Sequence, residues 1–274
     1  MGEEREKLKK YRLNRTSTSI GWSPESVNPL GWGCYGPNGT PEKPNPCWYC
    51  YAKEYARRGV RAGKFEGCVC HEFIPHWHPE QLEYLYFWRK KARIVSVQTM
   101  GDLFHPYTPE EHILKTIEAC YDNKKHVYQF TTRNPSRIQE ILQIWRRKQG
   151  KDGLNPPQNW WFGTTVTCQD EAHLVLQLPE NVNRFVSFEP LRGYVDLKQN
   201  QVEYIDWAII GGFSAMANRD PDTQSWKRFI YEQVKRIPCY VNKNIHESED
   251  ELPQKRPELM LAHTRKEIAK EFLL

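Results

Sequence analysis

The sequence has no apolar run long enough to cross a bilayer, so no membrane-spanning helix is expected. Its start is charged with no apolar stretch behind it, so no signal peptide is expected. Eight cysteines in 274 residues are too few for a disulfide scaffold. No Gly-x-Gly-x-x-Gly or phosphate-loop motif follows an expected strand, which weakens a dinucleotide-binding interpretation. We therefore expect a cytoplasmic protein with reduced thiols, in which clustered cysteines more often indicate a metal.

The excess of positive charge is small. A net charge of +5 with a pI near 8.7 is too weak, taken alone, to indicate a nucleic-acid-binding protein. The ten tryptophans and fourteen tyrosines supply flat rings that can stack on bases. A well-filled aromatic core is the simpler interpretation, and we favour it.

The composition divides the chain into three parts. Residues 1–15 predict a charged helix, residues 16–245 a folded domain, and residues 246–274 an acidic loop followed by a helix. The folded domain alternates short apolar strands with helical segments. Apolar strands without interruptions are typical of parallel strands buried on both faces. The alternation predicts either a β/α barrel or a doubly wound sheet. The expected strands are 16–22, 93–98, 126–130, 160–166, 184–188, 205–210 and 239–241.

Small, polar or charged residues follow nearly every expected strand. In a barrel these strand ends converge on one mouth, where barrel enzymes have their active sites. This favours an α/β fold with an incomplete TIM-type barrel of about six to seven parallel strands. The strand-end residues are Gly101, Asp102, Thr132, Arg133, Thr165, Glu189, Gly211, Gly212 and Lys243.

Three cysteines lie on a glycine- and proline-rich loop after the first expected strand. Twelve residues separate Cys34 from Cys47, Cys50 follows closely, and a helix is expected from Ala52. A closed zinc site, or an iron–sulfur cluster held entirely by protein, takes four ligands. Three ligands leave one position open, and an open position is where a metal site does chemistry. Cys34, Cys47 and Cys50 are therefore candidate metal ligands.

A second group of possible ligands follows, in which His76 and His78 come after Cys68, Cys70 and His71. Any one of Cys68, Cys70 and His71 would complete a set of four with the three loop cysteines and close the site around zinc. We expect His76 and His78 to be surface or loop residues rather than ligands. The remaining cysteines lie within or beside expected elements and are predicted to be small core residues: Cys120, Cys168 and Cys239.

Three cysteines on a loop after the first strand of a β/α barrel resemble the radical S-adenosylmethionine superfamily. There, the cysteines hold three irons of a [4Fe–4S] cluster, and S-adenosylmethionine chelates the fourth. The superfamily spacing is Cys-x3-Cys-x2-Cys, with an aromatic residue before the last cysteine. The second half is reproduced from Cys47 to Cys50, including Tyr49, whereas the first gap is twelve residues long instead of three.

More specifically, residues 16–245 resemble a family of uncharacterised phage-encoded and phage-related three-cysteine proteins. The family's sequence segments occur here in the same order, although Gly21 stands where the family has an acidic residue. If the chain is phage-encoded, its location would be the host cytoplasm. The matching segments are 20–22, 28–29, 33–34, 47–52, 101–104, 132–135, 161–166, 189–191 and 207–212.

The resemblance implies two cofactors, a [4Fe–4S] cluster and S-adenosylmethionine, and reductive cleavage that yields a 5′-deoxyadenosyl radical. Such chemistry belongs to the cofactor, which the protein orients. The strand-end glycines would let the backbone approach the cofactor. Thr132 and Thr165 are further candidates for binding it. Asp102 and Glu189 are candidates for its ammonium group or ribose hydroxyls, and Arg133 and Lys243 for its carboxylate or a substrate phosphate. Alternatively, these acidic and basic residues form buried ion pairs with one another.

The implied partner is an electron donor such as a flavodoxin or a ferredoxin. The turn at Cys50 and Tyr51 also resembles DNA-repair lyases of the superfamily, and basic residues nearby could line a phosphate path: Arg57, Arg58, Arg61 and Lys64. Nucleic acid is therefore the leading substrate, while peptides, small molecules and a dedicated partner protein stay open. The alternative class is a non-catalytic module that binds nucleic acid or protein around a structural zinc. We favour the cluster, because a structural metal does not need a charged barrel mouth.

Overall fold

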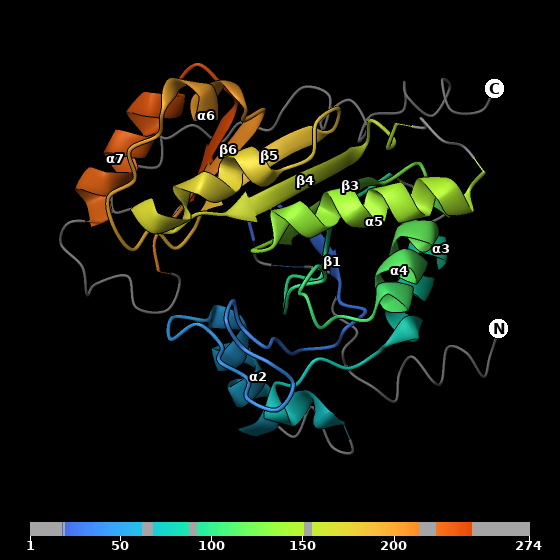
Figure 1. Cartoon of the computed structure of the whole chain (residues 1–274). Coiled ribbons are helices and arrows are strands. Elements are labelled where there is room, and N and C mark those ends of the chain that lie inside the picture. The colour runs from blue at the N-terminus through green and yellow to red at the C-terminus, as the bar shows by residue number, and fades with distance from the viewer. Residues whose placement is uncertain are drawn as a thin grey trace. The chain divides into compact units, whose positions relative to one another are not determined.

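The structure is a computed structural model that describes residues 18, 20–61, 68–87, 92–150, 155–213 and 223–242. The helices expected within residues 1–15 and 264–274 lie outside the described residues. The chain divides into two compact units, Met1–Thr131 and Thr132–Leu274 (Figure 1). The strands are β1 (Glu25–Val27), β2 (Ile94–Val97), β3 (Val127–Thr132), β4 (Trp160–Thr165), β5 (Asn183–Phe188), β6 (Trp207–Ile210) and β7 (Cys239–Val241).

The seven strands form one sheet in the order β1-β2-β3-β4-β5-β6-β7. The described pairings β1–β2, β2–β3, β4–β5, β5–β6 and β6–β7 are all parallel. A doubly wound sheet reverses its strand order at a switch point, whereas a β/α barrel adds each strand beside the previous one. The sequential order confirms the predicted incomplete TIM-type barrel.

The first strand is not where the sequence predicted it. Residues 20–22 form a turn, in which the amide of Ser23 donates to the carbonyl of Ile20 at 3.1 Å, and β1 begins only at Glu25. The hydroxyl groups of Ser23 and Ser96 hydrogen-bond at 2.5 Å, and both residues are buried. This contact ties the turn to β2, so Ser23 precedes the strand instead of ending it. In β1, Val27 pairs with Val97.

The second unit has an aromatic core around β4 and β5. Trp145 of α5 (Pro135–Lys148), Trp160 of β4 and Trp207 of β6 are fully buried, and α5 packs beside β4 (Figure 1). A side chain at Gly163 would begin 2.5 Å from the ring of Phe185, so only glycine leaves room for that ring on the neighbouring strand. The core interpretation of the aromatic content therefore holds here, whereas Trp48 is 72% exposed.

The helices follow the expected spacing with local differences. The segment expected as a helix near residue 170 is a 3-10 helix, η3 (Gln169–Gln177). A short helix, α6 (Gln199–Glu203), was not expected. Among the described residues, no helix combines the length and the apolar character of a membrane span. The remaining elements are α2 (Tyr51–Arg61), η1 (Val69–Glu72), η2 (Pro79–Leu82), α3 (Glu83–Phe87), α4 (Glu110–Asp122) and α7 (Thr223–Val234).

His126 makes the stability of the first unit depend on pH. Its ring is fully buried, its Nε2 donates to the carbonyl of Leu85 at 3.3 Å, and its Nδ1 accepts from the amide of Arg93 at 3.2 Å. Burial, together with the charges of Lys125 and Arg93, lowers the pKa of His126 from 6.5 to about 4. The neutral ring is therefore the folded form, and the unfolded chain takes up a proton first.

We predict that the unfolding free energy falls as the pH drops below 6.5, the ordinary pKa of histidine. The contribution of the neutral His126 ring to the unfolding free energy is fully present above pH 6.5 and is lost progressively down to about pH 4. Urea titrations at about pH 7 and about pH 4.5 should show a loss of about 2.5 kcal/mol from this residue. His126→Gln keeps a donor and an acceptor without the titration, so its loss over the same interval should be smaller. Equal losses in the two proteins would contradict this assignment.

Candidate metal centres

Residues 28–34, called here the glycine segment, run through the first unit as buried or half-buried backbone without regular structure. The side-chain oxygen of Gln98 accepts from the amide of Leu30 at 2.8 Å, and its Nε2 donates to the carbonyl of Gly31 at 3.0 Å. The amide of Cys34 donates to the carbonyl of Phe73 at 3.3 Å. Because buried backbone groups need partners, these bonds determine the path of the segment from β1 to Cys34.

The loop after Cys34 folds back on itself, as the long first gap between the cysteines requires. The amide of Asn45 donates to the carbonyl of Tyr35 at 2.6 Å, which closes the loop at its base. Gly36 has φ +83° and no space for a side chain, because a Cβ there would lie 1.8 Å from the carbonyl oxygen of Asn45. The closed loop returns the chain towards Cys34 just before Cys47.

The thiol of Cys50 lies at the N-terminus of α2. Its sulfur accepts from the amide of Lys53 at 3.4 Å, and its own amide donates to the carbonyl of Cys47 at 3.0 Å. The burial of Cys50 raises its pKa, and the neighbouring thiol of Cys47 adds to this, although the Lys53 amide opposes it. The helix end favours negative charge at this sulfur, which suits a metal-bound thiolate.

Cys34 is close enough to both other thiols, and to Asp102, for their charges to act on it. Its burial first, and then the charge of Asp102 with those of Cys50 and Cys47, raise the pKa of Cys34 to about 12. Cys34 and Cys50 also pack against one apolar cluster that contains Ala52 and Met100. The three predicted ligands therefore gather in one region of the first unit.

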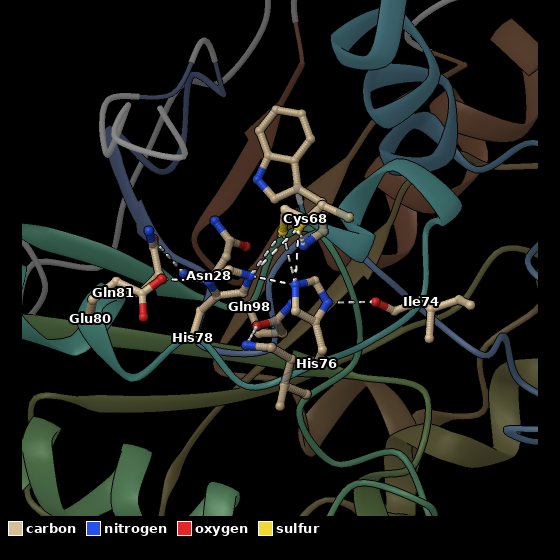
Figure 2. Close-up of polar contacts among 11 residues, drawn as sticks. Asn28, Cys68, Ile74, His76, His78, Glu80, Gln81 and Gln98 are labelled. Carbon is tan, nitrogen blue, oxygen red and sulfur yellow. Dashed lines mark hydrogen bonds and ion pairs between the residues drawn. The ribbon is translucent and has the colours of Figure 1, made fainter. Parts of the chain in front are cut away.

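The second group of ligands differs from the one the sequence predicted. The sulfurs of Cys68 and Cys70 face the rings of His76 and His78, and the candidate ligand atoms of these four residues lie within 4.8 Å of one another (Figure 2). His76 and His78 lie in a loop, as expected, but His78 is not a surface residue, since it is 7% exposed, and both rings belong to this group of candidate ligands. His71 is exposed, and its Nδ1 bonds the carbonyl of Cys68 at 2.6 Å instead.

The distances within this group are short and even. The Nε2 atom of His76 lies 3.2 Å from the sulfur of Cys68 and 3.6 Å from that of Cys70. The Nε2 atom of His78 lies 3.6 Å and 3.8 Å from the same two sulfurs. The two Nε2 atoms are 2.5 Å apart. Two thiols and two imidazoles thus converge on one point.

The His-x-His spacing explains why both rings reach the sulfurs. The amides of His76 and His78 donate to the carbonyls of Leu30 and Pro29, at 3.2 and 2.6 Å, so the segment lies extended beside the glycine segment. In extended backbone, residues two apart point to the same side. Trp77 lies between them and stacks on His112 of α4, with ring centroids 4.3 Å apart. The spacing is therefore a sequence signal for this site that composition alone does not reveal.

Gly101 and Asp102, predicted to bind the cofactor, contact the chain itself. A Cβ at Gly101 would lie 2.1 Å from the carbonyl oxygen of Gly33, so this glycine makes room for the glycine segment. The Oδ1 atom of Asp102 accepts from the amide of Phe104 at 3.0 Å and shapes the turn after β2. The charge of Asp102 nevertheless reaches the thiol of Cys34.

Arg133, at the end of β3, belongs to an ion-pair network in the second unit. Its Nη1 lies 2.6 Å from the carboxylate of Glu171, a residue that the sequence did not single out. Glu171 also accepts from the amide and the hydroxyl of Thr167, at 2.6 and 2.7 Å, and lies 3.4 Å from Nη2 of Arg192. Arg192 further donates to the sulfur of Cys168 at 3.3 Å, and Cys168 is only half-buried, unlike the small core residue predicted. Cys120 and Cys239 are buried as predicted.

The other strand-end residues of the second unit also find partners within it. Glu189 accepts from the side chain of Asn242 at 2.6 Å, and a Cβ at Gly211 would lie 2.6 Å from the carboxylate of Glu189. Thr132 is buried and accepts from the amide of Asn134 at 2.9 Å. Gly212 is buried and Thr165 half-buried. Lys243 lies outside the described residues.

The basic residues expected along a phosphate path are partly engaged on α2. Arg57 and Arg58 both contact the carboxylate of Glu54, at 2.6 and 3.1 Å, and all three side chains are substantially exposed. Hydrogen bonds from these arginines lower the pKa of Glu54 to about 2. The side chains of Arg61 and Lys64 are outside the described part of the chain.

One comparison with known proteins identified a family. Residues 17–245 match the model of a family described as a protein of unknown function (DUF5131). Neither a curated protein nor a solved structure matches the chain.

The Glu171 network should contribute to the stability of the second unit. Replacing Glu171 by Gln leaves Arg133 and Arg192 facing each other without their shared carboxylate. Because these side chains are 16–25% exposed, we expect a loss of about 2 kcal/mol in unfolding free energy, measured by urea denaturation. The matched control is Glu232→Gln, which removes an exposed pair with Lys235 and should cost less than about 0.5 kcal/mol. Similar losses in both variants would mean that the network contributes no more than a surface pair.

Proposed function

Because the chain belongs to this family of unknown function, we propose its activity from its own residues: it is an iron–sulfur protein of the radical S-adenosylmethionine type. Cys34, Cys47 and Cys50 are the proposed ligands of a [4Fe–4S] cluster. The fourth iron, which no cysteine binds, would bind S-adenosylmethionine. The cluster and S-adenosylmethionine together would supply reductive radical chemistry, and nucleic acid is the leading candidate for the substrate. A flavodoxin or ferredoxin is the proposed electron donor.

One observation carries this proposal. Of the three residues expected to be able to close the three-cysteine site around zinc, Cys68 and Cys70 are engaged with His76 and His78, and His71 is exposed and bonds the carbonyl of Cys68. Across the described ranges, Cys34, Cys47 and Cys50 do not themselves form a set whose ligand atoms lie within 4.8 Å of one another, and no His, Asp or Glu forms one with them. A mononuclear zinc needs such a tight set, whereas cluster thiolates each bind a different iron and stand further apart. Three thiols in one region, spaced more widely than a single zinc ion allows, support a cluster rather than a mononuclear zinc site.

The surroundings of the thiols are consistent with a cluster. Cys50 at the start of α2 receives a backbone amide, and amide hydrogen bonds to cluster sulfurs tune such sites. The hydroxyl of Tyr51 donates to the carbonyl of Thr99 at 2.5 Å, which ties the start of α2 to the chain that follows β2. Asp102, whose charge reaches Cys34, is the proposed acceptor for the ammonium group of S-adenosylmethionine. These residues would hold and orient the cluster and S-adenosylmethionine, and the radical chemistry belongs to the cofactor.

The alternative function is a non-catalytic module that binds nucleic acid or protein around a structural zinc. The observation in its favour is the Cys68, Cys70, His76 and His78 group, which suits a closed metal site and requires no cluster. The two functions differ in their metal content. The alternative requires no iron, and the proposed function requires iron that depends on the three loop cysteines.

We predict that anaerobically reconstituted protein binds about four irons per chain. Cys50→Ser should reduce iron and sulfide to near zero, because it removes one of three ligands. His71→Ala is the matched control, since this histidine belongs to the second group predicted from the sequence but is exposed. It should keep the full iron content. With dithionite and S-adenosylmethionine, the wild type should release 5′-deoxyadenosine, and Cys50→Ser should release none.

Two outcomes would overturn the proposal. Wild-type protein that takes up no iron under anaerobic reconstitution would favour the non-catalytic module. Equal iron loss in Cys50→Ser and His71→Ala would indicate a closed site that uses His71 as the fourth ligand.

A further inference from the structure

The rings of His76 and His78 face each other in a way that requires a cation. The Nδ1 atom of His76 bonds the carbonyl of Ile74 at 2.9 Å, and the Nδ1 atom of His78 bonds the carboxylate of Glu80 (Figure 2). A carbonyl and a carboxylate only accept, so both Nδ1 atoms carry the proton. In the neutral rings the Nε2 lone pairs then point at each other across 2.5 Å. Such an arrangement is repulsive unless a metal ion or a shared proton lies between them, and the two facing sulfurs favour the metal ion.

The same geometry suits one zinc ion. Zn–S distances of about 2.3 Å and Zn–N distances of about 2.0 Å, at tetrahedral angles, place sulfur and nitrogen about 3.5 Å apart. The four observed separations run from 3.2 to 3.8 Å. The two nitrogens would stand about 3.3 Å apart around zinc, so the rings would separate slightly on binding. Two sulfurs and two nitrogens in a tetrahedron are typical of zinc.

The surrounding hydrogen bonds are those of a metal site. Metal-binding histidines almost always donate a hydrogen bond from the N–H of their second ring nitrogen to a carboxylate or a backbone carbonyl, which orients the ring. Glu80 and Ile74 fill these two roles. The amide of Trp32 donates to the sulfur of Cys70 at 3.3 Å. All four ligand positions are filled by protein, so the site would be closed and structural.

The glycine segment wraps this group. Its carbonyls at Pro29 and Leu30 accept from the amides of His78 and His76. Gly31 has φ +63°, and a Cβ there would lie 2.7 Å from the ring of His78 and 3.1 Å from the sulfur of Cys70. Trp32 packs against both Cys70 and the cluster of residues that contains Cys34. The four ligands thus lie directly under the segment that leads to Cys34.

We propose that Cys68, Cys70, His76 and His78 bind one zinc ion as a closed structural site, and that this ion holds the glycine segment in place so that Cys34 is positioned beside Cys47 and Cys50. The zinc site stands on its own geometry. Only its effect on Cys34 as a cluster ligand rests on the proposed function. The four residues are positioning residues, since none of them touches the proposed cofactors.

Metal analysis of purified full-length protein tests the zinc site. The wild type should carry about one zinc per chain, and Cys70→Ser and His78→Ala should carry almost none. His71→Ala, in the same loop, and Cys50→Ser, in the other group, should keep their zinc. His76→Cys should also keep it, because three cysteines and one histidine bind zinc equally well. Zinc loss in Cys50→Ser would overturn the proposal, as would full zinc in Cys70→Ser.

Replacement of zinc by Co²⁺ reports the ligands directly, even where a variant is less stable. The wild type and His76→Cys should show tetrahedral cobalt bands with sulfur-to-cobalt charge transfer, and the charge-transfer band of His76→Cys should be stronger. An octahedral spectrum without charge transfer would contradict ligation by Cys68 and Cys70. Circular dichroism identifies any variant that has not folded. If a variant has not folded, the cobalt spectra of the wild type and of His76→Cys decide whether the four residues bind the metal.

Hydrogen exchange tests the effect on the glycine segment. Removal of zinc by a chelator should accelerate exchange of the amides in residues 28–34 by about tenfold or more, and leave those of β5 unchanged. Cys70→Ser should then also lower iron occupancy, whereas Cys50→Ser should leave zinc intact. Unchanged exchange, or unchanged iron in zinc-free Cys70→Ser, would overturn the positioning effect while the zinc site stands. Absence of iron from the wild type would overturn the proposed function alone.

Discussion

The buried backbone of residues 28–34 is the constraint on which the first unit depends. It is not part of a strand, and its polar groups are bonded by Gln98, by Phe73, and by the amides of His76 and His78. The residues that allow this close packing are glycines, because the neighbouring atoms at Gly31, Gly33 and Gly101 leave no room for a Cβ. Each of these contacts bears on one of the two candidate metal centres.

The two centres are adjacent in structure but distinct in chemistry. Trp32 packs against the apolar residues around both, while its amide bonds the sulfur of Cys70. One centre gathers four ligands and has ring nitrogens oriented by Glu80 and Ile74, as a closed structural site requires. The other gathers three thiols near an acidic residue, with one thiol at a helix N-terminus. Under the two proposals, the closed site would hold a metal that stabilises the fold, and the open site a metal that reacts.

Several residues predicted to bind the cofactor make contacts that serve the fold. Gly101 makes room for Gly33, Gly211 for the carboxylate of Glu189, and Arg133 is bound by Glu171. The sequence raised the alternative of ion pairs among the strand-end residues, and Arg133 does form one, but with a partner from η3. Strand ends in parallel sheets collect polar residues for both reasons, and only the contacts distinguish them.

The sequence by itself determined the parallel α/β class, the positions of six of the seven strands, β2 to β7, and the loop with three cysteines. These follow from local properties: short apolar runs, helical spacing between them, and glycine and proline in the loop. It missed the turn at residues 20–22, because the contact between Ser23 and Ser96 joins positions far apart in the chain. Only the tertiary structure decided that Cys68 and Cys70 face His76 and His78 rather than the loop cysteines. The spacing of Cys68, Cys70, His76 and His78 is a local signal for a metal site, but whether these cysteines also join the loop cysteines depends on how the fold places the two loops.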